Sequence, residues 1–303
     1  MSNAIELQGV TKRFREQVAV DSLDLTVPTG SIYGFIGPNG SGKTTTLRMI
    51  LRIFQPDEGV VKVLGNMHGK TADDRLGYLP EERGLYKRMK VRSLLTYYAK
   101  LKNFRNCRDE IEMWLERLDA KEWANKRIDA LSKGMSQKIQ FISAVIARPE
   151  LVILDEPFSG LDPVNMEVLR DAVLELRKQG TTVVFSTHDM DVAEQMCDTI
   201  FMIFKGKKVL DGTLDSIQQE YAADRVRVRL ANPEAQLPHV DGIFETEKTN
   251  GFWEFRMQDA NAAPHVMRNL ASQTEMTHFE VVRPTLHEIF VRIARPDAAA
   301  IAS

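Results

Sequence analysis

The sequence reads Gly37-Pro38-Asn39-Gly40-Ser41-Gly42-Lys43-Thr44, and Thr45 follows. A strand is predicted from Ser31 to Ile36 before this stretch, and a helix from about Gly42 to Ile53 after it. The pattern fits a phosphate loop, in which glycines let backbone N–H groups curl toward phosphate oxygens at the start of a helix. We expect Lys43 to bridge the β- and γ-phosphates of a nucleotide and Thr44 to ligate Mg²⁺.

Two carboxylates end a second strand. Residues Leu151 to Leu154 are all apolar, and Asp155-Glu156-Pro157 follows them directly. An acidic pair at a strand end can simply be solvated, so this stretch alone leaves its role open. Beside a phosphate loop it completes a nucleoside triphosphatase site. Asp155 would then hold Mg²⁺ through water, and Glu156 would orient and deprotonate the attacking water.

Strands and helices alternate around these two motifs. The elements expected after Glu156 are a helix over Pro163 to Gln179, a strand over Thr181 to Ser186, a helix over Asp189 to Met196, and a hairpin of Thr199 to Phe204 with Lys207 to Leu210. This alternation predicts an α/β fold with a mostly parallel sheet that binds its ligand at the carboxyl ends of the strands. Alternating residues at Ile5 to Leu7 and Leu23 to Val27 predict strands of an antiparallel β subdomain.

A helical insert interrupts the α/β pattern at about residues 84–148. Apolar residues recur there at helical spacing, in the sets Val91, Leu94, Leu95, Tyr98, Leu101 and Ile111, Trp114, Leu115, Leu118. We therefore predict a P-loop NTPase core at residues 1–218 that contains this helical subdomain.

A second, smaller domain is predicted at residues 225–295, followed by a frayed tail at 296–303. Val226 to Leu230 and Phe252 to Met257 alternate like strands, Ala262 to Ala271 is helical, and a short strand and helix follow. These elements predict an α+β domain. Trp253 and Phe255 should face one side of its sheet and Phe252 the other, so one face would pack on its own helix and the other could contact something else.

Length, charge and composition exclude several classes of protein. At 303 residues the chain favours two domains, and its formal net charge of −2 argues against nucleic-acid binding. No apolar stretch approaches the ~18 residues of a membrane span, and the N-terminus lacks the apolar segment of a signal peptide. We therefore expect a cytoplasmic protein whose membrane role comes through a partner. Cys107 and Cys197 are far apart, and the six histidines show no zinc spacing, so no structural metal is predicted.

Several further motifs, taken together, resemble the ABC ATPases. Leu131-Ser132-Lys133-Gly134-Met135 is similar to their signature motif, Ser159 to Asp162 to the D-loop, Ser186-Thr187-His188 to the H-loop, and Gly77 to Glu81 to the Q-loop. Phe14 stands where that family has an aromatic residue that stacks on adenine. The order and spacing match over residues 4 to about 215.

The resemblance implies roles for individual residues. Phe14 would contact adenine, and His188 would contact the γ-phosphate and hold Glu156 in line with water. Ser132 and Gly134 would bind the γ-phosphate of ATP held by a second copy, and Asp162 would cross the interface of that homodimer. The implied ligands are ATP and Mg²⁺, with the ion held by Thr44, Asp155 and Glu81.

The sequence departs from the family pattern at three positions. Lys133 and Met135 replace a glycine and a glutamine of the signature, and Glu81 replaces the Q-loop glutamine. The last change leaves the geometry around Mg²⁺ open. The segment Glu81 to Tyr86 resembles the NatA-type subgroup, whose members pair with ABC-2-type membrane permeases. This resemblance implies an exporter subunit on the inner face of the membrane. Tyr86 is a large amphipathic residue in a loop, which predicts that the permease docks near Leu85, Tyr86 and the helix over 91–103, unless Leu85 and Tyr86 simply pack onto the insert.

Three alternatives are weighed against this interpretation. An ABC ATPase of DNA repair would carry a long heptad insert and a ribosome factor two cassettes, and neither occurs. A regulator that holds ATP without turnover is disfavoured by Glu156 and His188. A GTPase would need an Asn/Thr-Lys-x-Asp motif, and Asn125-Lys126-Arg127-Ile128 lacks the Asp. The resemblance implies that the membrane subunit, and not this chain, recognises the transported substrate.

Overall fold

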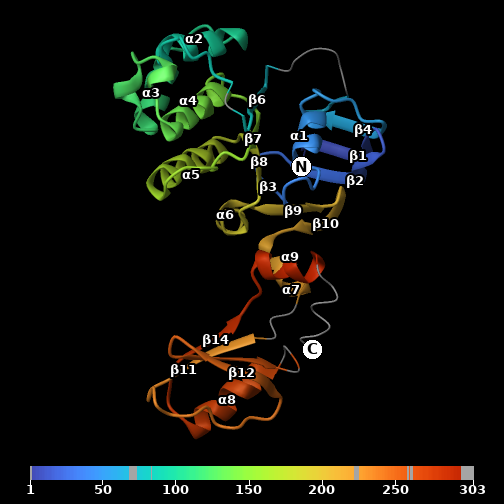
Figure 1. Ribbon diagram of the computed structural model, residues 1–303, viewed down its shortest axis with the longest axis vertical. Helices are drawn as coiled ribbons and strands as arrows, with labels where there is room; N and C mark the ends of the chain where they lie inside the picture. The colour runs from blue at the N-terminus through green and yellow to red at the C-terminus, as the bar shows by residue number, and fades with distance from the viewer. Residues whose placement is uncertain are drawn as a thin grey trace. The chain divides into compact units, whose positions relative to one another are not determined.

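The computed structural model describes residues 2–67, 74–82, 84–221, 225–257, 259 and 262–294. Contacts between Cα atoms divide the chain into two compact units, Met1–Leu214 and Asp215–Ser303. The tail expected at 296–303 lies outside the described residues. Figure 1 shows the helices and strands of each unit.

An antiparallel sheet opens the first unit. Its described strands, in the order β2-β1-β4-β5, are β1 (Asn3–Phe14), β2 (Gln17–Pro28), β4 (Glu58–Val63) and β5 (Asn66–Met67). Leu23, Leu25 and Val27 are buried while the residues between them are exposed, which is the alternation of a half-buried strand. β1 and β2 extend beyond the predicted segments because register shifts break the alternation along them.

The central sheet of the first unit is mostly parallel. Its described strands, in the order β10-β9-β3-β8-β7-β6, are β3 (Ile32–Ile36), β6 (Leu76–Leu79), β7 (Leu151–Asp155), β8 (Thr182–Thr187), β9 (Thr199–Phe204) and β10 (Lys207–Gly212). β3, β7 and β8 are buried along their whole length, as expected for parallel strands covered on both faces. β10 pairs antiparallel with β9, which confirms the predicted hairpin.

Two apolar clusters cover the two faces of the central sheet. On one face, helix α1 (Lys43–Ile50) lies between this sheet and the antiparallel strands, through Leu47 and Ile50 (Figure 1). On the other face, α5 (Pro163–Lys178) and α6 (Met190–Met196) pack with the helical insert. The carboxyl ends of the parallel strands therefore open between these layers.

The helical insert follows β6 and precedes β7. Its described elements are α2 (Val91–Leu101), α3 (Arg108–Arg117), the 3₁₀ turns η1 (Lys121–Trp123) and η2 (Ile128–Ala130), and α4 (Lys133–Val145). Trp114 of α3 packs edge-on against Phe141 of α4, with ring centroids 5.8 Å apart. These helices share one apolar cluster with the central sheet, so α4 packs against the sheet at β6 and β7.

The second unit is a small sheet with helices. Its described elements are α7 (Leu214–Glu220), which begins at the boundary, then β11 (Arg225–Leu230), β12 (Ile243–Thr249), β13 (Phe252–Met257), α8 (Ala263–Gln273), β14 (Met276–Val282) and α9 (Leu286–Ala294). The strand order is β12-β13-β11-β14, and every pair is antiparallel. β12 was not predicted, because almost all of its residues are exposed and an edge strand lacks the apolar alternation.

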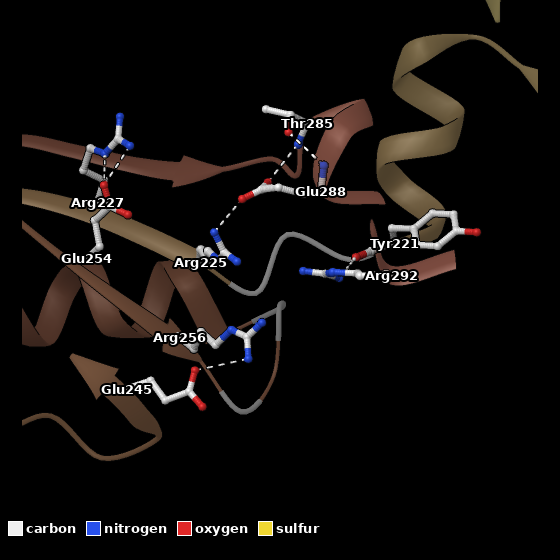
Figure 2. A network of polar contacts seen from close by, with 9 residues as sticks. All are labelled: Tyr221, Arg225, Arg227, Glu245, Glu254, Arg256, Thr285, Glu288 and Arg292. Carbon is white, nitrogen blue, oxygen red and sulfur yellow. Dashed lines mark hydrogen bonds and ion pairs between the residues drawn. The ribbon is translucent and has the colours of Figure 1, made fainter. Parts of the chain in front are cut away.

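The two faces of this sheet differ. Phe255 and Trp253 pack with Val266 and Leu270 of α8, as the alternation predicted. On the polar side Arg227 pairs with Glu254 at 2.7 Å, and Figure 2 shows this pair together with Arg225–Glu288 and Arg256–Glu245. Phe252 lies under Arg229, whose Cζ is 3.9 Å from the ring centroid. Arginine side chains therefore cover Phe252, the aromatic residue on the face that was predicted to be free for a contact outside this domain.

Candidate functional site

The loop from β3 to α1 can be built only with glycine at two positions. A Cβ atom on Gly37 would lie 2.3 Å from the carbonyl oxygen of Ile203, and one on Gly42 would lie 2.6 Å from that of Ala19. Gly42 also has a φ of 112°, which other residues rarely adopt. The loop therefore closes tightly on its neighbours and turns directly into α1.

Two polar groups in this loop, Ser41 and Lys43, are suited to a phosphate. The Oγ atom of Ser41 is buried and has no hydrogen-bond partner. Lys43 is 6% exposed, and its Nζ donates to the carbonyl oxygens of Gly37 at 2.6 Å and Pro38 at 3.2 Å. Burial lowers the pKa of Lys43, and the carboxylates of Glu156, Asp155 and Glu81 oppose that shift. An unpartnered hydroxyl and a buried ammonium group at a helix N-terminus fit an anionic phosphate.

Asp155 and Glu156 leave β7 beside the end of β8, where Ser186 connects them. The Ser186 hydroxyl donates to Asp155 Oδ1 and accepts a hydrogen bond from the Glu156 N–H at 3.0 Å. Glu156 has a φ of 50°, in the left-handed region that costs a non-glycine residue about 1–2 kcal/mol. Such strain at a strand end is typical of functional sites.

Glu156 contacts His188, which follows β8. Nδ1 of His188 lies 3.0 Å from each carboxylate oxygen of Glu156. Burial raises the pKa of Glu156, while the contact with His188 and the charge of Lys43 oppose the rise. Burial likewise raises the pKa of Asp155, against the hydrogen bond from Ser186. Both carboxyl groups are therefore more basic than exposed ones.

Lys43, Glu156 and His188 line a cavity of about 610 Å³, whereas the buried Asp155 is not among its lining residues. It is lined by Phe14, Gln17, Ala19, Asn39, Gly40, Gly42, Lys43, Thr44, Thr45, Glu81, Glu156, Ser159 and His188. Phe14 is exposed at the rim and packs edge-on against Phe54, with centroids 5.5 Å apart. The cavity therefore brings together the predicted adenine contact, most of the phosphate loop, the predicted metal ligands Thr44 and Glu81, and the Glu156–His188 pair.

Three predicted residues lie elsewhere. Ser132 is the N-cap of α4 and its hydroxyl accepts from Met135 N at 3.3 Å, and Asp162 caps α5 by accepting from Asn165 N at 3.0 Å. Gly134, in the first turn of α4, is close to Leu161 and Asn165. None of the three is among the residues that line the cavity. One copy of the chain therefore carries two separate groups of the predicted site residues.

Three residues at the site, Ser186, Gln137 and Gln140, had no role predicted from the sequence. Ser186 lies in the quoted Ser186-Thr187-His188 stretch, so its place at a strand end was visible but its bridge to Asp155 was not. Gln137 and Gln140 are buried in α4 and donate to loops at the site. Polar residues on the buried side of a helical pattern were the available signal for these two.

Comparison with known proteins places the chain in a family. A family model of ABC transporters matches residues 20–159, and a model of the C-terminal domain of DrrA1-3-like ATP-binding proteins matches residues 212–294. The uncharacterized ABC transporter ATP-binding protein YhaQ of Bacillus subtilis is 40% identical over 289 residues, which are 95% of this chain and 97% of that protein. This chain belongs to the ABC transporter ATP-binding proteins.

Other ABC transporter ATP-binding proteins match over much of the chain. NatA of B. subtilis is 33% identical over 225 residues, 71% of this chain and 92% of that one. The Nod factor export ATP-binding protein I of Paraburkholderia xenovorans is 32% identical over 256 residues, 82% of this chain and 84% of that one. A solved ATP-binding subunit of an ABC transporter superposes with a TM-score of 0.66 at 27% identity, covering 72% of this chain and 93% of that one. The predicted fold class and the resemblance to NatA-type proteins are confirmed.

Proposed function

We propose that this ABC transporter ATP-binding subunit hydrolyses ATP with Glu156 as the base, between two facing copies, and so drives a separate membrane permease. The observation that carries the proposal is the contact of His188 Nδ1 with both carboxylate oxygens of Glu156, at the wall of the cavity that the phosphate loop opens into. This arrangement puts an oriented, buried carboxylate beside a site suited to a triphosphate.

The phosphate loop would hold the triphosphate. Backbone N–H groups of residues 37–45 and the Lys43 ammonium group would contact the phosphate oxygens, and Ser41 Oγ would gain the partner it lacks. Thr44, Asp155 and Glu81 would hold Mg²⁺, which neutralises charge on the phosphates when bound. Phe14 would stack on the adenine ring at the cavity rim.

Glu156 would take the proton of the attacking water. Its raised pKa makes it a stronger base than an exposed glutamate. His188 holds the carboxylate on one side and would contact the γ-phosphate on the other. Glu156 has a strained, left-handed φ, and its side chain lines the cavity.

A second copy would complete the site. Ser132 and Gly134 lie at the N-terminus of α4, away from the cavity of their own chain. Two copies placed head to tail would bring them to the γ-phosphate held by the partner, with Asp162 at the interface between the copies. ATP would favour this closed dimer because only the dimer supplies both halves of the site.

The permease and the direction of transport form the second part of the proposal. Among the described residues no helix is long and apolar enough to span a bilayer. We infer that a separate ABC-2-type permease holds this subunit at the inner face of the membrane and exports its substrate. One relative is named for Nod factor export, and the exposed Tyr86 on the helical insert offers a docking residue.

Glu156→Gln tests the proposed hydrolysis. The variant should bind ATP as the wild type does, lose about 10²–10⁴-fold in turnover and accumulate as an ATP-dependent dimer. Calorimetry, phosphate release and light scattering measure these three properties. Near-normal turnover in this variant would remove Glu156 from the role of base.

A further inference from the structure

One buried side chain ties the loop that carries Glu81 to helix α4. Gln140 Nε2 donates hydrogen bonds to the carbonyl oxygens of Pro80, at 3.0 Å, and Glu82, at 3.3 Å. These two carbonyl groups lie on either side of Glu81 in the chain. Gln140 itself is 3% exposed, and both hydrogen bonds are partly buried.

The amide of Gln140 is only half satisfied. Its Oε1 atom is buried and has no hydrogen-bond partner. A buried polar oxygen without a partner destabilises a fold, so an apolar side chain of similar length would suit simple packing better. What the amide adds at this place is its pair of donors to the Glu81 loop.

The same helix holds a second loop of the site. Gln137, one turn before Gln140, donates from Nε2 to the carbonyl oxygen of Pro157 at 3.0 Å, directly after Glu156. At the start of α4 lie Ser132 and Gly134. Helix α4 therefore connects three parts of the proposed site. Its N-terminus would meet the partner's nucleotide, and its glutamines hold the two loops of its own chain that carry Glu81 and Glu156.

We propose that Gln140 is the positioning residue for Glu81. By fixing the peptide groups on both sides of Glu81, it makes that loop move with α4. Closure of α4 on the partner's nucleotide then sets Glu81 toward Mg²⁺ in its own cavity. This inference rests on the proposed function, because it needs MgATP in the cavity and a second copy facing α4.

The test measures how Mg²⁺ affects ATP binding, in the full-length Glu156→Gln protein, so that turnover plays no part. Calorimetric titrations with ATP at a series of Mg²⁺ concentrations give the concentration that produces half of the effect. Gln140→Met keeps the length of the side chain and removes both donors. We expect it to raise the half-effective Mg²⁺ concentration about tenfold, the scale known for residues that orient metal ligands. ATP affinity without Mg²⁺ should stay unchanged.

Two controls separate positioning from packing. Ile142→Val, a buried change two residues further along α4, should leave the Mg²⁺ dependence unchanged. Where Gln140→Met does not fold, Gln140→Glu replaces it. Its side chain has the same shape, and its ionised carboxylate cannot donate, so it should shift the Mg²⁺ dependence in the same direction.

A double-mutant cycle with Glu81→Ala tests whether Gln140 acts through Glu81. Glu81→Ala should itself raise the half-effective Mg²⁺ concentration, and adding Gln140→Met should raise it no further. Equal shifts with and without Glu81, or a shift under about twofold in the Gln140 variant alone, would overturn the positioning role. If the parent protein binds no ATP, the proposed function fails as well. If the parent binds MgATP and Gln140→Met changes nothing, only this inference fails.

Discussion

His188 and Glu156 meet at the wall of the nucleotide-sized cavity, with Nδ1 of the imidazole 3.0 Å from each carboxylate oxygen. The Glu156 side chain is 9% exposed and that of His188 is 56% exposed. The histidine therefore stands between a buried base and solvent, with its other ring edge available to a ligand. This geometry makes the two residues one functional unit.

Removing the histidine should disable the base. We expect His188→Ala to lower turnover by about 10²–10⁴-fold, because Glu156 loses the partner that orients it. ATP affinity measured by calorimetry should change little, since the phosphate loop is untouched. The double variant with Glu156→Gln should cost no more than either single change. Losses that multiply would contradict a shared role.

Neutralising Glu156 should stabilise the fold at neutral pH. Folding raises the pKa of this carboxyl group from 4.5 by burial, so its contribution to stability is complete below 4.5 and is lost as pH rises through the raised value. Glu156→Gln should thus unfold at a higher temperature than the wild type at pH 7.5, by about 2–4 °C for each kcal/mol recovered. The gap should narrow as the pH falls toward 4.5. Equal melting temperatures at pH 7.5 would show that the partners of Glu156 cancel its burial.

Loss of the loop lysine should abolish ATP binding. Lys43→Ala removes the buried ammonium group that would meet the γ-phosphate charge. Calorimetry measures the affinity, and thermal unfolding checks that the loop survives without the hydrogen bonds to Gly37 and Pro38. Lys62→Ala, a partly buried lysine on β4, is the matched control and should bind ATP normally. Unchanged affinity in Lys43→Ala would refute the phosphate-loop assignment.

The exposed tyrosine of the helical insert should couple the subunit to its permease. Tyr86 is 52% exposed and packs edge-on against Tyr97, with ring centroids 5.6 Å apart, whereas Leu85 packs onto the insert. Tyr86→Ala should abolish transport and leave the ATPase of the isolated subunit intact. Val60→Ala, which removes an exposed apolar side chain from β4, outside the helical insert, should transport normally. A fall in the isolated ATPase would instead assign Tyr86 to packing.

The second unit should modulate dimer formation. Helix α7 spans the boundary predicted near Gln218, so the chain is better ended at Leu214. That shorter protein should bind ATP with similar affinity and form the Glu156→Gln dimer less readily, as light scattering would show. Normal dimerisation would refute modulation, and insolubility would make the unit a structural cap.

Local patterns in the sequence were enough to identify the family and most of the cavity. The phosphate loop, the Asp155–Glu156 strand end and the His188 strand end are each continuous in sequence. The carboxyl ends of β3, β7 and β8 meet at one edge because parallel strands must align there. Periodicity likewise predicted the helical insert, whose apolar residues form one cluster. Edge strand β12 lacks such a pattern and was missed.

Tertiary structure alone decided how those pieces are held. Ser186 bridges Asp155 and Glu156 from a neighbouring strand, and Gln140 reaches carbonyl groups of Pro80 and Glu82 some sixty positions earlier. Motif spacing cannot predict such bonds, because donor and acceptor meet only after the helical insert packs against the central sheet. The sequence by itself determined which groups would do the chemistry. Packing determined their orientation, since a hydrogen bond depends on distances of a few tenths of an ångström that only the folded chain defines.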